Sequence, residues 1–246
     1  MLAVFFGVFA LAPDFAVARV FDLKRESFAS YLNFSYGPSA AADGAFAGES
    51  AATGYSGKID QNIVAEFGFV YTTSVISWRF GLEILKPAVV NATATDAGGA
   101  ELYGVKSDIL GVMPKIALEM NFVTRNSYRL YLSGFAGQAS VTVTNTYTNL
   151  TVAPNADFEM QYKGGASAYG GALGYELAAF DTTSVLLEVG YRKLVFDQLT
   201  YGKDVAADFS SASRSAGDTV KRDGGDNRKL DFSGAYVSLG ARWWLF

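Results

Sequence analysis

The side chains of this chain most able to do chemistry are ionisable groups that recur at alternate positions of apolar segments. Arg79 and Glu83 belong to one such segment, and Lys115 and Glu119 belong to the next. Alternate residues of a β-strand point to one face, so each pair would share a face. The set that this alternation places on one face is balanced in charge and comprises Glu66, Arg79, Glu83, Lys115, Glu119, Arg129, Glu176, Glu188, Arg192 and Arg242. We therefore predict a network of ion pairs.

One antiparallel register would oppose Arg79 to Glu119 and also Glu83 to Lys115. A second register would oppose Glu188 to Arg242. Directly opposed charges of unlike sign stabilise a sheet by about 0.2–1 kcal/mol per pair. A chance coincidence of numbering is the alternative explanation for these registers.

The composition excludes several kinds of function. The chain has no histidine and no cysteine, which removes the commonest general base, the commonest metal ligand and all thiol chemistry. Glu176 and Glu188 could form a carboxylate pair, but Arg129 or Arg242 would neutralise it. We expect no enzyme activity, no catalytic residue, no cofactor and no metal site. The net charge of −4 offers no basic surface to a nucleic acid.

The elements that position these groups are predicted strands with an apolar parity and a polar parity. We expect eight of them, with ten as the alternative, at 27–36, 58–72, 75–87, 105–123, 127–144, 158–180, 183–197 and 231–246. The fold class is then all-β: a closed, antiparallel, up-and-down transmembrane barrel with its apolar parity facing lipid. A soluble sandwich or lipocalin-like barrel, with that parity facing inward, is the alternative. The chain has no apolar run of about 18 residues that would predict a spanning helix.

The connections alternate between short turns and long segments. The long segments, 37–57, 88–104, 145–157 and 198–230, are expected to be extracellular loops, and the short turns to be periplasmic. The charged composition of 198–230 predicts a solvated segment that buries no core, and we expect residues 200–229 to tolerate deletion without loss of folding. Aromatic residues near the short turns predict a girdle at the membrane surface, formed by Tyr71, Phe122, Tyr128, Phe180 and Trp243.

Two further patterns complete the organisation. Residues 1–18 predict a signal peptide that ends at Ala16-Val17-Ala18, a buried first strand or short helix being the alternative. Residues 19–26 would then be a periplasmic segment and 27–246 the barrel. The small inward residues Gly170 and Gly174 predict room for Phe135 and Tyr131, with a small-ligand cavity as the alternative.

The strand number, the alternation of loop lengths and the ending with Trp244 and Phe246 resemble the small outer-membrane barrels of the OmpA transmembrane-domain, OmpX and OmpW type. The resemblance implies an outer-membrane protein with both termini in the periplasm. It also implies that Trp244 and Phe246 form a signal for the barrel-assembly machinery. The parity of Phe246 continues with Arg242, however, and the parity of Trp243 is more apolar. A bulge near Trp243 and Trp244 would reconcile the two.

We therefore expect a non-enzymatic integral outer-membrane barrel with a charge-paired, largely plugged interior and surface loops for structural or contact roles. A narrow channel or binding barrel for a small, hydrophobic molecule is the alternative. The expected partners are outer-membrane lipids, the assembly machinery and an unknown extracellular ligand. We expect a monomer without cofactors.

Overall fold

The computed structural model describes residues 21–46, 52–73, 75–154, 156–209, 212–222 and 225–245. The predicted signal peptide and Phe246 lie outside these ranges. Eight long strands follow one another along the chain: β1 (Phe28–Ala42), β3 (Ile59–Thr72), β4 (Ile76–Leu85), β6 (Glu101–Thr124), β7 (Tyr128–Thr148), β8 (Phe158–Phe180), β9 (Thr183–Phe196) and β12 (Gly234–Trp244). No helix in the described ranges has the length and apolar character that a helical membrane span requires.

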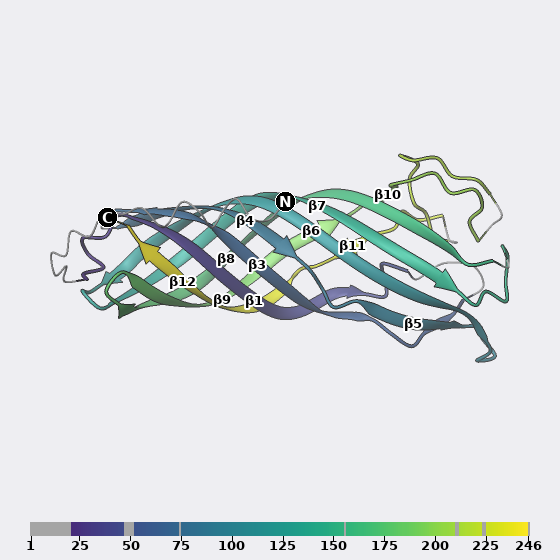
Figure 1. Ribbon diagram of the computed structural model, residues 1–246, viewed down its shortest axis with the longest axis horizontal. Helices are drawn as coiled ribbons and strands as arrows, with labels where there is room; N and C mark the ends of the chain where they lie inside the picture. The colour runs from purple at the N-terminus through teal and green to yellow at the C-terminus, as the bar shows by residue number, and fades with distance from the viewer. Residues whose placement is uncertain are drawn as a thin grey trace, which may run out of the picture.

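Each long strand pairs antiparallel with the next, and β12 pairs with β1. The sheet therefore closes into a ring without free edges, which Figure 1 shows as an elongated barrel of slanted strands. The prediction of eight strands is confirmed, and the alternative of ten is wrong. Short turns join β3 to β4, β6 to β7 and β8 to β9 at one end of the barrel.

The strands continue into segments that the sequence assigned to loops. β1 extends to Ala42, β6 begins at Glu101 and β7 ends at Thr148. Four short strands also lie there: β2 (Gly54–Tyr55), β5 (Val90–Thr95), β10 (Thr200–Tyr201) and β11 (Leu230–Asp231). β5 pairs with β6 and β2, β10 with β8, and β11 with β9. The predicted loops are therefore partly stranded, and the barrel wall rises beyond the apolar part of the strands.

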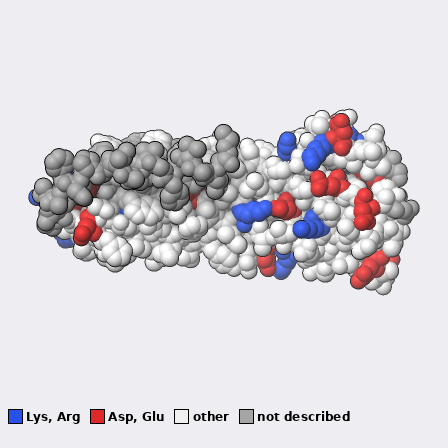
Figure 2. All heavy atoms as spheres, in the orientation of Figure 1, with Lys and Arg blue, Asp and Glu red and all other residues white. Residues whose placement is uncertain are grey.

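The outer face carries an apolar belt on all eight long strands. Its most exposed members include Phe34, Phe69, Phe80, Met120, Leu132, Leu173, Val189 and Leu239, each more than half exposed. On the face seen in Figure 2, the charged side chains in the described part gather mostly toward one end of the barrel. An apolar surface that encircles the whole molecule indicates contact with lipid. We call the part of the barrel inside this belt the lower section.

Beyond the belt, in what we call the upper section, the two faces exchange their chemistry. β6 shows the change: its outer residues are Lys106 and Asp108 in the upper section, and Leu110 is the first of its outer belt residues in the lower section. On the inner face, Val105 and Ile109 are buried in an apolar core in the upper section. Charged groups fill the lower section instead. A wet outer wall requires an apolar core, whereas a lipid-facing wall leaves the interior free to be polar.

Candidate functional site: a charged barrel interior

The ten predicted inward charges all lie inside the barrel. Nine of them are buried as whole residues: Glu66, Arg79, Glu83, Glu119, Arg129, Glu176, Glu188, Arg192 and Arg242. The side chain of Lys115 is 6% exposed. Strand parity explains the placement, because in the lower section of the barrel alternate residues of each strand face lipid and the residues between them face the lumen.

At the upper end of this cluster, Glu83 joins two cations. Its Oε1 lies 2.5 Å from Nη1 of Arg192, and its Oε2 lies 3.1 Å from Nζ of Lys115. The same ammonium lies 2.7 Å from Oε2 of Glu66. One lysine thus bridges carboxylates on the neighbouring strands β3 and β4.

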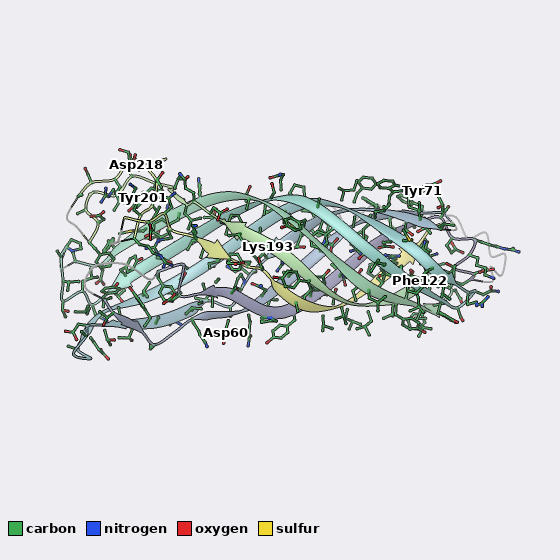
Figure 3. All side chains as sticks on the ribbon, turned by 180° about the vertical axis from the view of Figure 1, so that it is seen from behind. Asp60, Tyr71, Phe122, Lys193, Tyr201 and Asp218 are labelled. Atoms are coloured by element: carbon green, nitrogen blue, oxygen red, sulfur yellow. The ribbon has the colours of Figure 1, made fainter. Side chains whose placement is uncertain are left out.

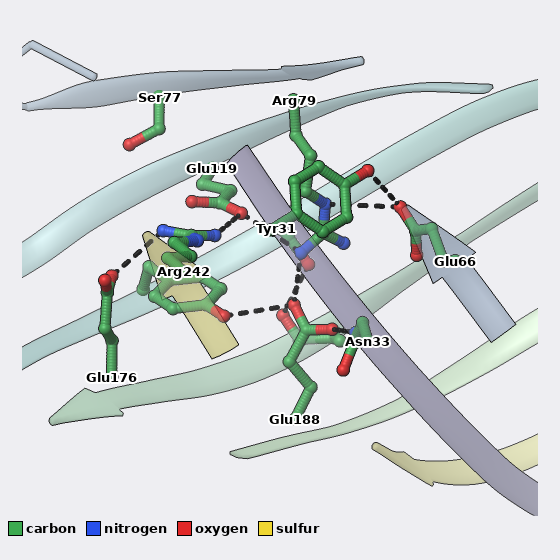
Figure 4. Close-up of polar contacts among 12 residues, drawn as sticks. Tyr31, Asn33, Glu66, Ser77, Arg79, Glu119, Glu176, Glu188 and Arg242 are labelled. Atoms are coloured by element: carbon green, nitrogen blue, oxygen red, sulfur yellow. Dashed lines mark hydrogen bonds and ion pairs between the residues drawn. The ribbon is translucent and has the colours of Figure 1, made fainter. Parts of the chain in front are cut away.

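In the middle of the cluster, Arg79 contacts three glutamates. Its Nη1 lies 2.9 Å from Oε1 of Glu188 and 3.2 Å from Oε1 of Glu119, and its Nε lies 3.6 Å from Oε1 of Glu66 (Figure 4). These carboxylates come from β3, β6 and β9. Because they converge from three sides of the ring, Arg79 holds together strands that are far apart in sequence.

At the lower end, Arg242 joins Glu119 to one further carboxylate, that of Glu176. Its Nη2 lies 2.5 Å from Oε1 of Glu119, and its Nη1 lies 2.9 Å from Oε2 of Glu176 (Figure 4). Arg129 lies 3.5 Å from the same Glu176 oxygen. The ten residues thus form one continuous series in which every ion pair joins opposite signs. We call this set of ten the charge ladder.

Neutral side chains complete the ladder, and sequence reasoning missed their hydrogen bonds to the carboxylates. The hydroxyl of Tyr31 donates to Glu66 at 2.6 Å, and Nδ2 of Asn33 donates to Glu188 at 3.0 Å. Tyr131 donates to Glu188 at 3.1 Å. Tyr31 and Asn33 share the inward parity of β1, which was the available signal. Buried carboxylates need such donors because unsatisfied acceptors are costly away from water.

Aromatic rings lie beside four of the five cations, one of them Arg129, whose guanidinium carbon lies 5.3 Å from the centre of the Trp244 ring. The guanidinium carbon of Arg79 lies 5.5 Å from the centre of the Tyr31 ring, and that of Arg242 lies 5.5 Å from the centre of Tyr131. Nζ of Lys115 lies 4.6 Å from the Phe135 ring. These distances fit cation–π attraction, which is stronger at desolvated sites than at exposed ones.

Both predicted registers are wrong, although the charges between β4 and β6 still meet. Arg79 is directly opposite Ala117, and Lys115 is opposite Gly81, two residues from the predicted register. The long side chains reach their partners diagonally. Glu188 and Arg242 are opposite Ser238 and Ser184 and do not pair.

Glu188 and Arg242 instead find their partners on other strands across the lumen. Glu188 contacts Arg79, and Arg242 contacts Glu119 and Glu176. A loop midpoint is a poor guide to register where strands extend unequally beyond the belt. The predicted neutralisation of Glu176 by Arg129 and Arg242 agrees with the contacts of this carboxylate.

The small residues of β8 make room for large rings on β7. Tyr131 is opposite Gly174, and Phe135 is opposite Gly170. A Cβ on Gly174 would lie 2.1 Å from the Tyr131 ring, and one on Gly170 would lie 2.7 Å from the Phe135 ring. The packing explanation of these glycines therefore holds, and the rings occupy the space that a ligand would need.

The interior leaves little free volume at the level of the ladder. A cavity of about 10 Å³ borders Glu66, Glu83 and Glu188. That is about the volume one water molecule needs. Above it the apolar core fills the upper section, where Phe46, Tyr103, Met160 and Phe232 are among the buried residues.

The segment that precedes β1 packs inside the short-turn end of the barrel. Leu23 is buried against Trp244, Ala29 and Val70. Nη2 of Arg129 donates to the carbonyl oxygen of Leu23 at 2.7 Å, and Nε1 of Trp244 donates to Ser184 at 2.9 Å. The predicted segment 19–26 thus lies across the floor of the barrel in its described part, residues 21–26.

Trp244 therefore faces the interior, where it is buried. The pairing of β1 with β12 keeps one register from Ala29 opposite Trp244 to Tyr36 opposite Val237. The predicted bulge near Trp243 and Trp244 is absent from this described stretch of pairing. The parity of Trp243 faces outward, as the apolar pattern indicated.

The predicted aromatic girdle lies at the short-turn end of the outer face. Tyr71, Phe122, Phe180 and Trp243 are exposed there, and Tyr128 packs against Tyr175. Figure 3 shows Tyr71 and Phe122 at the same end of the barrel. The described residues contain no group of three or more metal-ligating side chains.

Comparison with known proteins gives the fold and no closer relationship. No family model and no curated protein matches the chain. A major outer membrane protein from Thermus thermophilus is similar in structure, with a TM-score of 0.50, 9% identity, and coverage of 89% of this chain and 99% of that chain. The chain has the fold of a small outer-membrane β-barrel.

Other solved structures are similar at lower scores. Neisserial surface protein A matches with a TM-score of 0.46 and 11% identity, over 89% of this chain and 97% of that chain. The outer membrane protease OmpT from Escherichia coli matches with a TM-score of 0.41 and 9% identity, over 91% of this chain and 98% of that chain.

Proposed function

We propose that this protein is a non-enzymatic integral barrel of the outer membrane that is closed to solutes and presents its loops at the cell surface. Its role is structural, or its surface loops make contacts outside the cell. The single observation that carries the proposal is the small free volume of the interior: the cavity at the level of the charge ladder holds only about 10 Å³.

The dimensions of the belt support the membrane placement. The outward residues of β8 from Tyr169 to Leu177 span nine positions and are apolar or glycine. A tilted transmembrane strand needs about 9–11 residues. We place the short-turn end, with its aromatic girdle and the floor segment, in the periplasm. Both chain ends then lie on that side, and the upper section lies outside.

The interior supports a closed barrel at three levels. Leu23 and Trp244 block the floor, the charge ladder fills the middle, and the apolar core fills the upper section. An ion entering such a lumen would have to separate buried ion pairs, which is strongly unfavourable. The absence of histidine supports a non-enzymatic role.

Planar-bilayer conductance of the purified protein tests this proposal. We expect no single-channel steps after insertion. Protection of the barrel from protease in lipid vesicles verifies separately that the purified protein can insert. A matched variant, Arg79→Ala, opens space in the charge ladder. It serves as the control in which conductance is more readily detected. Discrete conductance steps of the unmodified protein would refute the closed interior and support the narrow channel.

A further inference from the structure

Two hollows follow one another along the outer wall of β7 and β8, from the apolar belt into the upper section, and the lower one also extends over β4 and β6. We call the two together the trough. Its lower part is a hollow of about 800 Å³ with an almost wholly apolar lining. Small residues form its floor, among them Ala136, Gly137 and Ala168. The rings of Phe80 and Tyr169 border it. This part of the trough lies at the upper limit of the lipid-facing surface.

A proline in the middle of β6 contributes to this hollow. Pro114 has no N–H, and the pairing between β6 and β7 is interrupted between Val112 opposite Ser140 and Lys115 opposite Gly137. The wall therefore lacks both ladder hydrogen bonds and bulky outward side chains at this point. The result is a depression in a surface that is elsewhere covered by large apolar residues.

The upper part of the trough is polar. It is a second hollow, of about 430 Å³, lined by residues that include Ser140, Thr142 and Lys163. The two hollows lie along the same pair of strands, β7 and β8. Gln138, opposite Ser167, lines the lower hollow, and Thr142, opposite Lys163, lines the upper hollow. The trough thus changes from apolar to polar along a single pair of strands.

Within the described ranges, Lys163 lacks the carboxylate partner that three other lysines of the upper wall have. Lys86 pairs with Asp108, Lys193 with Asp231, and Lys203 with Glu159. Among the residues that the structure describes, Lys163 has no carboxylate partner, and it is exposed. The polar end of the trough therefore presents a positive charge that no carboxylate in the described part of the chain neutralises.

The position of Lys163 suits the head group of a membrane lipid. It lies four residues beyond Ser167 along β8, which is on the order of 13 Å of strand. The flexible stem of lysine can bring the ammonium back toward the membrane surface. Lysine binds phosphate as a point charge, and the hydroxyls of Ser140 and Thr142 can donate hydrogen bonds beside it.

We propose that this trough binds one phospholipid of the outer leaflet through an anionic phosphate head group at Lys163 and an acyl chain in the apolar hollow. The proposal rests on the membrane placement given above. It assigns the outer wall of β7 and β8 a ligand of defined chemistry: an anionic lipid that stays with the protein after extraction from the membrane.

Native mass spectrometry of the detergent-purified protein, incubated with phosphatidylglycerol or with phosphatidylcholine, tests the proposal. We expect one tightly retained phosphatidylglycerol, and a preference over phosphatidylcholine of about fivefold, since one lysine near an anionic surface contributes on the order of 1 kcal/mol. Lys163→Gln should abolish the preference. Ala136→Phe should fill the hollow and lower the retention of both lipids.

Matched controls separate the trough from general effects of charge and bulk. Lys106→Gln removes an outward charge of β6 outside the trough, and Ala235→Phe adds a ring to an exposed position of β12. Both should retain lipid like the unmodified protein. An undiminished preference in Lys163→Gln, or undiminished retention in Ala136→Phe, would overturn the proposal. Competition by glycerol 3-phosphate alone as strong as that by the lipid would also overturn it.

The heat-dependent shift of each variant on gels verifies that the barrel is folded. Loss of lipid by a folded barrel concerns the trough alone. Failure of the unmodified protein to insert into vesicles would instead contradict the membrane placement.

Discussion

Arg79 is the best-connected cation of the interior, and it shows how single residues stabilise the lower section. Its guanidinium contacts Glu66, Glu119 and Glu188, which come from three different strands. Two ions of opposite sign in a dry interior gain from each other only if further hydrogen bonds satisfy their remaining groups. Tyr31, Asn33 and Tyr131 supply such bonds to Glu66 and Glu188. Nε of Arg79 and Oε2 of Glu119 are buried without a hydrogen-bond partner.

Replacing Arg79 by methionine should therefore destabilise the barrel strongly. The change keeps most of the volume but leaves three buried carboxylates short of a partner, and we expect a loss of about 3–5 kcal/mol in unfolding free energy. Urea unfolding in lipid vesicles, followed by tryptophan fluorescence, measures it. Lys106→Met, at an exposed outward position, should change stability by less than about 0.5 kcal/mol. Equal midpoints for the two variants would contradict the ladder's role.

Gly174 offers a second test at the scale of one residue. A Cβ there would lie 2.1 Å from the Tyr131 ring, whereas the nearest atom to a Cβ on Gly134 is 4.0 Å away. We expect Gly174→Ala to lower stability by about 1–3 kcal/mol, as overpacking does. Gly134→Ala should leave it nearly unchanged. The same urea titration compares them, and a neutral Gly174→Ala would show that the ring moves aside freely.

At the scale of the element, the strands and their faces could be predicted because lipid and lumen impose opposite chemistry on alternate residues. The predicted 158–180 matches β8, and the predicted 58–72 differs from β3 by one residue at its start. Register could not be predicted, because it depends on how far each strand runs past the belt. The diagonal contact of Arg79 with Glu119 shows that long side chains tolerate a shift of two residues.

The segment between β9 and β12 was judged wrongly from its charge. Leu199, Val220 and Arg228 are buried in it. The ring of Phe209 lies 4.8 Å from that of Tyr103 and 5.0 Å from that of Tyr147. Scattered apolar residues between charges carry no periodic signal, so their packing over the mouth of the barrel could not be read from composition.

This packing refines the expected effect of deleting 202–229. The lower section should still fold, because none of the ten ladder residues lies in the deleted segment. The apolar core of the upper section should become exposed. A short Gly-Ser linker in place of the segment should therefore preserve the heat-dependent gel shift and increase the binding of the dye ANS. A variant that fails to insert, or one without added dye binding, would contradict this expectation.

For the molecule as a whole, the two ends differ in what a protease can reach from outside the cell. Lys203, Lys221 and Lys229 are exposed at the loop end, and Lys24 and Arg25 are exposed at the short-turn end. We expect trypsin added to intact cells to cleave only within 203–229. Cleavage near Lys24 should require a permeabilised outer membrane, which is the matched control. Cleavage at Lys24 in intact cells would reverse the orientation.

The exchange of chemistry between the lower and upper sections bears on how the barrel reaches its correct pairing. A strand threaded one residue out of step turns every side chain to the opposite wall. For β6, such a slip would drive Lys115 and Glu119 into acyl chains and would turn Val105 and Ile109 toward the surrounding water. Both errors raise the free energy of the same misaligned strand. The correct register is therefore favoured in the lower section and in the upper section at the same time.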